Sequence, residues 1–92
     1  MVRIVIVDDE PLARKKIRRL LKNDPELEIV GEYGNGQAAL TAIQENPPDV
    51  LLLDIQMPEM DGLQMARRLP VERTPYIIFV TAYDRFAVTK MM

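Results

Sequence analysis

The sequence predicts an α/β protein with a doubly wound parallel sheet, in which helices cover both faces. Residues 2–7 and 50–53 are apolar at almost every position, which is typical of strands buried on both faces. Helical spacing of apolar residues follows each of these runs, and such alternation favours parallel crossover connections. With 92 residues and no repeat or linker, we expect one domain.

The first half of the chain contains two strands and two helices. Pro11 suits the first turn of a helix, because that position needs no N–H donor. Apolar residues recur at helical spacing until Asn-Asp-Pro at residues 23–25 ends this helix. Residues 27–33 partly alternate, as in a more exposed strand. A Gly-Asn-Gly turn then leads into a helix over residues 38–45, which Asn-Pro-Pro at residues 46–48 ends.

Strands and helices also alternate in the second half of the chain. Residues 50–53 form the third strand, and a loop over residues 56–62 leads into a short helix that ends at Pro70. Residues 76–80 form the fourth strand, and residues 84–92 are expected to begin another helix. The predicted order is therefore β-α-β-α-β-α-β-α.

The composition excludes several chemistries. Without Cys the chain has no disulfide or thiolate, and without His it has no Ser-His-Asp triad, imidazole ligand or phosphohistidine. A formal net charge of -2 gives no electrostatic case for binding nucleic acid. No signal peptide or long apolar run is evident, so we expect a cytoplasmic protein without membrane contact.

Three aspartates follow buried strands: Asp8 and Asp9 after the first, and Asp54 after the third. Open parallel sheets bind ligands beyond the carboxyl ends of their strands, so these carboxylates are expected to meet. Two unit charges about 4 Å apart interact by roughly 4 kcal/mol at an effective dielectric constant of 20. Protonation or a hard cation such as Mg²⁺ would relieve this repulsion, and one carboxylate could be a nucleophile for phosphoryl transfer.

Three segments in the right order resemble the receiver domains of two-component response regulators. Val-Ile-Val-Asp-Asp-Glu-Pro at residues 5–11 resembles their opening. Leu-Asp-Ile-Gln-Met-Pro-Glu-Met-Asp-Gly at residues 53–62 resembles their phosphoacceptor strand and loop, and Val-Thr-Ala at residues 80–82 resembles their switch segment. The resemblance covers nearly the whole chain and implies a flavodoxin-like receiver fold.

The resemblance also implies roles for five residues. Asp54 would be the phosphoacceptor, and it would share a Mg²⁺ site with the direct ligand Asp9. Asp8 would act on the ion through water, and the backbone carbonyl of Gln56 would be a further ligand. Thr81 would supply the switch hydroxyl that moves toward the phosphoryl group. The implied phosphoryl donor is a sensor histidine kinase, and the chain itself would not be an enzyme.

Residues 11–14, 31–32 and 81–83 further resemble receivers attached to LytTR-type DNA-binding domains. This likeness implies a parent protein that regulates transcription. DNA would then be contacted only through a separate output domain that is absent from these 92 residues.

The resemblance is incomplete after the fourth strand. Receivers continue with a fifth strand and a fifth helix, and a Lys-Pro motif after that strand supplies a Lys that binds the phosphoryl group. Lys90 follows Thr81 too closely to have crossed a whole helix and strand. We therefore expect residues 1–92 to be a truncated receiver domain, from the first strand to the start of the fourth helix. It would lack the fifth strand and fifth helix, and phosphorylation of Asp54 would be impaired.

Without a fifth strand, residues 76–80 would form an exposed sheet edge. This segment is apolar, uncharged and free of Pro, which favours pairing with another chain. We expect self-association through this edge or a swapped element. The alternative function is an interaction module that acts by such pairing, independently of phosphorylation. A small phosphohydrolase is less favoured, because such enzymes place a second acid where this chain has Gln56.

The candidate residues also have simpler interpretations. The acids before the first helix could only stabilise its N-terminus, where negative charge is favoured. Asp54 could be an ordinary turn acid, and Thr81 could only cap a helix. The basic residues between positions 14 and 19 are interpreted as a solvated helix face, with contact to a partner kinase as the alternative.

Overall fold

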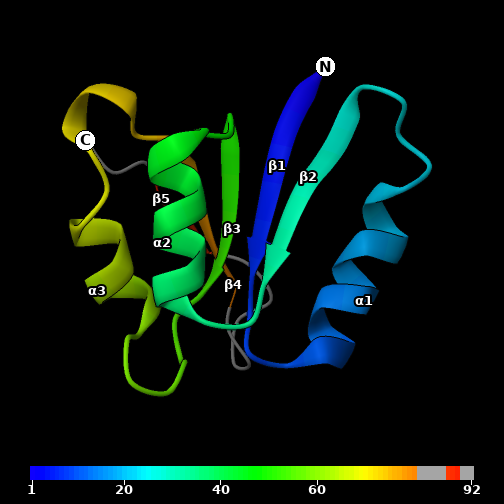
Figure 1. Ribbon diagram of the computed structural model, residues 1–92. Helices are drawn as coiled ribbons and strands as arrows, with labels where there is room; N and C mark the ends of the chain where they lie inside the picture. Colours follow the sequence, from blue (N-terminus) through cyan, green and yellow to red (C-terminus); the bar gives the residue numbers. More distant parts are fainter. Residues whose placement is uncertain (81–86, 90–92) are drawn as a thin grey trace.

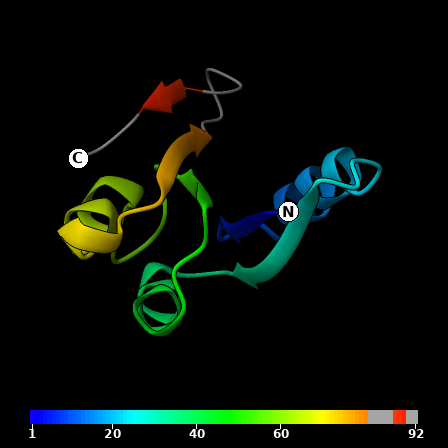
Figure 2. The same cartoon turned by 90° about the horizontal axis from the view of Figure 1, so that it is seen from above.

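The computed structural model describes residues 1–80 and 87–89. These residues form a five-stranded sheet with helices on both faces (Figures 1 and 2). The strand order is β2-β1-β3-β4-β5, and β1 to β4 pair in parallel. The predicted doubly wound parallel sheet is therefore confirmed.

Strands and helices alternate along the chain as far as the fourth strand. Their bounds are β1 Val2–Val7, α1 Pro11–Leu21, β2 Leu27–Tyr33, α2 Gly36–Glu45, β3 Val50–Asp54, α3 Gly62–Arg67, the 3-10 helix η1 Val71–Arg73, and β4 Tyr76–Val80. Helix α2 begins two residues earlier than predicted, because the Asn35 side chain accepts a hydrogen bond from the Ala38 N–H and caps it. Among the helices of the described residues, none is long and apolar enough to cross a membrane.

The two faces of the sheet carry separate cores. The larger core lies under α2 and α3, and the smaller one lies under α1 around Ile17. Successive strand residues point to opposite faces, so β1 contributes Val5 and Val7 to the larger core and Ile4 and Ile6 to the smaller. Because β1 is buried on both faces, the chain leaves it from a firmly held position at Val7.

The segment after β4 corrects two predictions. Residues 84–92 were expected to begin a helix, but Ala87–Thr89 form strand β5, which pairs antiparallel with residues 77–79 of β4. Tyr76–Val80 was expected to be an exposed edge, and this is wrong for its centre, because β5 covers it. An apolar edge strand exposes unpaired backbone groups, and here a nearby segment of the same chain satisfies them. Residues 77–79 are therefore not free to pair with another chain in this structure, while self-association by other means, such as a swapped element, stays a prediction.

Candidate functional site

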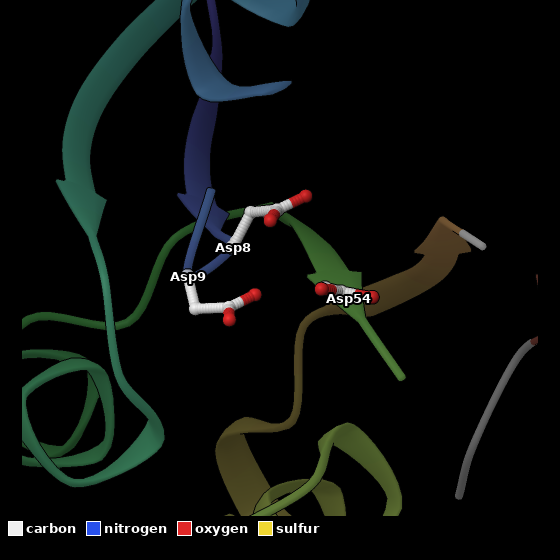
Figure 3. Close-up of side chains that lie close together, drawn as sticks. All are labelled: Asp8, Asp9 and Asp54. Atoms are coloured by element: carbon white, nitrogen blue, oxygen red, sulfur yellow. The ribbon is translucent and has the colours of Figure 1, made fainter. Parts of the chain in front are cut away.

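The carboxyl ends of β1 and β3 bring the three aspartates together (Figure 3). Val7 pairs with Leu53 across these neighbouring strands, so the next residues, Asp8 and Asp54, leave the sheet at the same level. One carboxylate oxygen of each of Asp8, Asp9 and Asp54 lies within 4.8 Å of the others. The three carboxylates therefore meet, as the sequence predicts.

Asp8 is held by hydrogen bonds from three directions. Its N–H donates to the Tyr33 carbonyl oxygen at the end of β2 over 3.0 Å. Its carbonyl oxygen accepts a hydrogen bond from Arg14 Nη1 of α1 over 2.5 Å, and its Oδ1 accepts one from the Glu10 N–H over 2.9 Å. Asp8 is only 6% exposed, so its position is largely set by the protein around it. The Glu10 contact closes a local turn between β1 and α1, and the N-cap of α1 itself has no side-chain hydrogen bond.

Asp54 ends β3 and is partly buried. Its Oδ1 accepts a hydrogen bond from the Gln56 N–H over 3.1 Å. Loss of hydration on burial raises the pKa of Asp54 to about 6, against the lowering effect of the Gln56 hydrogen bond. The negative charges of Asp8 and Asp9 add to this rise. Asp54 is thus still mostly ionised at neutral pH, and a cation among the three carboxylates would favour that ionised form.

The three aspartates line an open cavity of about 330 Å³ at the carboxyl ends of the strands. The other lining residues are Glu10, Ala13, Gln56 and Val80. A water molecule takes up about 30 Å³ in the liquid, so the cavity has room for a hydrated ion and a small anionic group. Each of the three aspartates offers a carboxylate oxygen as a ligand atom, and oxygen ligands suit a hard cation such as Mg²⁺.

The loop after β3 depends on Gly62. A Cβ atom at this position would lie 2.4 Å from the Asp54 carbonyl oxygen, which is closer than the two atoms can approach. The Gly62 N–H also donates to the Ile55 carbonyl oxygen over 2.9 Å. Helix α3 starts here with a reciprocal cap between Asp61 and Gln64. Gly62 therefore serves backbone geometry, because the lack of a Cβ lets α3 begin directly against the phosphoacceptor candidate.

Two features of the site were missed by the sequence analysis. Arg14 was grouped with a solvated basic face, yet its guanidinium reaches the Asp8 carbonyl oxygen and lies 3.9 Å from Glu32. The sequence does not distinguish Arg14 from the other basic residues of α1, and only the structure shows that it shares Glu32 with Arg18 one turn later. Glu59 has a φ of 68°, in the region that favours glycine, and no sequence signal marks it. Thr81, the predicted switch residue, and Lys90 lie outside the described residues.

The family model of the response regulator receiver domain matches residues 4–92. The chain therefore belongs to the response regulator receiver domain family. It is 50% identical over 88 residues to the transcriptional regulatory protein BtsR of Salmonella typhimurium, covering 96% of this chain and 37% of BtsR. The chain thus spans little more than a third of the length of this curated relative.

Solved structures show the same fold. The signal receiver domain of the putative response regulator NarL from Mycobacterium tuberculosis matches with a TM-score of 0.79 and 41% identity, over 90% of this chain and 68% of that one. The response regulator domain of Thermotoga maritima CheB matches with a TM-score of 0.82 and 26% identity, over 89% and 61%. The predicted flavodoxin-like receiver fold is confirmed. The predicted LytTR-type subfamily gains no support, because these relatives carry the names of BtsR-type, NarL-type and CheB-type proteins.

Proposed function

We propose that this receiver domain accepts a phosphoryl group on Asp54 from a phosphohistidine of a sensor histidine kinase, at a site that holds Mg²⁺. The observation that carries the proposal is the approach of Asp8, Asp9 and Asp54 within 4.8 Å of one another beside an open cavity. The cluster offers a carboxylate nucleophile and carboxylate ligands for a cation, which are two of the components that phosphoryl transfer to a carboxylate uses, and this supports the proposal for a chain of the receiver family.

In the proposed reaction an oxygen of the Asp54 carboxylate forms a bond to phosphorus as the bond between phosphorus and the imidazole nitrogen of the donor breaks. The imidazole leaves with that electron pair, and an acyl phosphate remains on Asp54. When bound, Mg²⁺ would neutralise part of the negative charge on the phosphoryl oxygens. The Gln56 N–H, which already donates to Asp54 Oδ1, holds the carboxylate in a defined orientation.

The other residues of the site would bind and respond. Asp9 is proposed as the direct ligand of Mg²⁺ from the first strand end, and Asp54 shares the ion. Asp8 is proposed to act through water, and the backbone carbonyl of Gln56 is proposed as a further ligand. Thr81 is proposed as the hydroxyl that moves toward the new phosphoryl group. Since one matched relative is a transcriptional regulatory protein, we infer that the parent protein regulates transcription, with DNA contacted by a separate part of it.

The proposal is tested by incubating the full chain with a small phosphodonor and Mg²⁺ and measuring its intact mass. We expect a gain of one phosphoryl group that disappears when Mg²⁺ is removed or in the Asp54→Asn variant. The gain should be partial, because no Lys-Pro motif occurs in these 92 residues. Asp24→Asn is the matched control. Asp24 Oδ1 accepts a hydrogen bond from the Glu26 N–H, just as Asp54 Oδ1 accepts one from the Gln56 N–H.

Two results would contradict the proposal. One is the absence of any mass gain in the unmodified chain. The other is a gain that persists in Asp54→Asn, which would place the phosphoryl group on a different residue. Association of the chain that is identical in the unmodified protein and in Asp54→Asn, with no phosphorylation of either, would instead support the interaction module.

A further inference from the structure

We propose that Arg14 is a positioning residue for the metal ligands, in that it holds the turn formed by Asp8 and Asp9 in the geometry that binds Mg²⁺. This inference rests on the proposed function, because it concerns how the same site is held. It adds a residue of α1 that donates to the backbone of the site and supplies no ligand atom of its own.

The guanidinium of Arg14 connects three elements. Its Nη1 donates to the carbonyl oxygen of Asp8 over 2.5 Å, and its Nε lies 3.9 Å from Oε1 of Glu32 on β2. The Arg14 and Glu32 side chains are 21% and 23% exposed, so the ion pair is partly shielded from solvent. A planar guanidinium presents several donors in fixed directions, which lets one side chain contact a backbone carbonyl and a carboxylate together.

The carbonyl that Arg14 contacts belongs to the peptide bond between Asp8 and Asp9. This peptide group is planar, so a hydrogen bond to its oxygen restrains the direction in which the chain enters Asp9. Asp8 is also held by two other hydrogen bonds: its N–H donates to the Tyr33 carbonyl oxygen, and its Oδ1 accepts from the Glu10 N–H. Arg14 thus acts chiefly on the orientation of Asp9, the proposed direct ligand, relative to Asp54.

Arg18 provides a matched control on the same helix. It lies one turn beyond Arg14, and its Nη1 makes the shorter ion pair with Glu32, at 2.6 Å from Oε2. Its hydrogen bond goes to that carboxylate and not to the backbone of Asp8. A variant of Arg18 therefore removes a positive charge and an ion pair from the same region without removing the contact to the site.

The sign of the change separates positioning from simple electrostatics. Removing a positive charge close to an acidic cluster reduces the repulsion felt by an incoming cation, so Coulomb's law alone predicts tighter Mg²⁺ binding. Loss of positioning predicts weaker binding. Mutation of groups that orient metal ligands lowers metal affinity by about 10- to 100-fold, and we expect a loss of about tenfold for Arg14→Ala.

The test is a Mg²⁺ titration of the full chain followed by NMR amide shifts, for the unmodified chain, Arg14→Ala, Arg14→Lys and Arg18→Ala. We expect weaker binding in both Arg14 variants, because a lysine ammonium does not reproduce the forked geometry of the guanidinium. Affinity in Arg18→Ala should not fall, because this variant removes a positive charge but keeps the contact to Asp8. The amide shift of Asp9 without Mg²⁺ should change in the Arg14 variants and not in Arg18→Ala.

The outcomes distinguish this inference from the proposed function. An unmodified chain that binds no Mg²⁺ would overturn the proposed function and the inference together. A chain that binds Mg²⁺, with equal or tighter binding in Arg14→Ala, would overturn the role of Arg14 alone. If Arg14→Ala does not fold, Arg14→Lys decides, and unchanged affinity in that variant would overturn the inference.

Discussion

The acidic site has two walls, Asp8 and Asp9 after β1 and Asp54 after β3, and the two are held in different ways. The Oδ1 atoms of Asp8 and Asp54 each accept a hydrogen bond from the N–H two residues further on, but Asp8 is also held by the Tyr33 carbonyl of β2 and the Arg14 side chain of α1. Asp54 is held locally, by the Gln56 N–H and by the close approach of Gly62 to its carbonyl oxygen. One wall thus depends on the packing of α1 and β2 against β1, and the other depends on the backbone of a single loop. The two walls should therefore respond to different substitutions.

The largest effect is expected at Gly62. In Gly62→Ala the new Cβ meets backbone atoms that have little room to move, and we expect a loss of about 3 kcal/mol in the free energy of unfolding. Urea unfolding measures this loss. Gly34→Ala is the control, because the nearest atom to its Cβ is the end of the flexible Arg14 side chain at 3.3 Å. Equal stability of the two variants would contradict the account of the loop.

A smaller effect of opposite sign is expected for Asp54→Asn. The pKa of Asp54 is raised from 3.8 to about 6, so the folded protein binds more protons than the unfolded chain between these values. The stabilisation that follows is fully present below pH 3.8 and is lost as the pH rises through 6. At neutral pH without Mg²⁺, Asp54→Asn should therefore be more stable, by about 1 kcal/mol after allowance for solvent screening.

This effect is measured by urea unfolding of Asp54→Asn and the unmodified chain between pH 4 and 8, with Asp24→Asn as the control variant. The stability difference between Asp54→Asn and the unmodified chain should grow as the pH rises from about 4 to 6 and should then level off. A difference that stays constant over this range would show that burial does not raise the pKa of Asp54.

The smallest effect is expected for the ion pairs of Glu32. In Glu32→Gln both arginines lose a charged partner, and we expect a loss of about 0.5–1 kcal/mol that shrinks at high salt. Mg²⁺ affinity should fall less than in Arg14→Ala, because Arg14 keeps its hydrogen bond to Asp8. A fall as large as in Arg14→Ala would show that Glu32 is needed to orient Arg14.

The sheet and the acidic cluster were predictable because the same residues determine both. Two apolar runs predict buried parallel strands, and open parallel sheets bind ligands beyond the carboxyl ends of their strands. In the structure Val7 of β1 pairs with Leu53 of β3, which places Asp8 beside Asp54.

The remaining features depend on tertiary contacts that local sequence does not encode. Arg14 reaches Asp8 only because α1 packs beside β2, and its helical position alone does not distinguish it from exposed basic neighbours. Strand β5 has three residues, too few for a periodic pattern, and it forms because β4 offers an apolar edge. The positive φ of Glu59 likewise follows from the path of the loop and not from its own propensity.

The central claim is that the three aspartates form one Mg²⁺ site with Asp54 as its reactive member. The most direct measurement is an NMR pH titration of the Asp54 carboxyl carbon with and without saturating Mg²⁺. The account predicts a pKa of about 6 without the ion and a clearly lower pKa with it, because a shared cation favours the ionised carboxylate. A pKa of Asp54 that is the same in both conditions would contradict the claim.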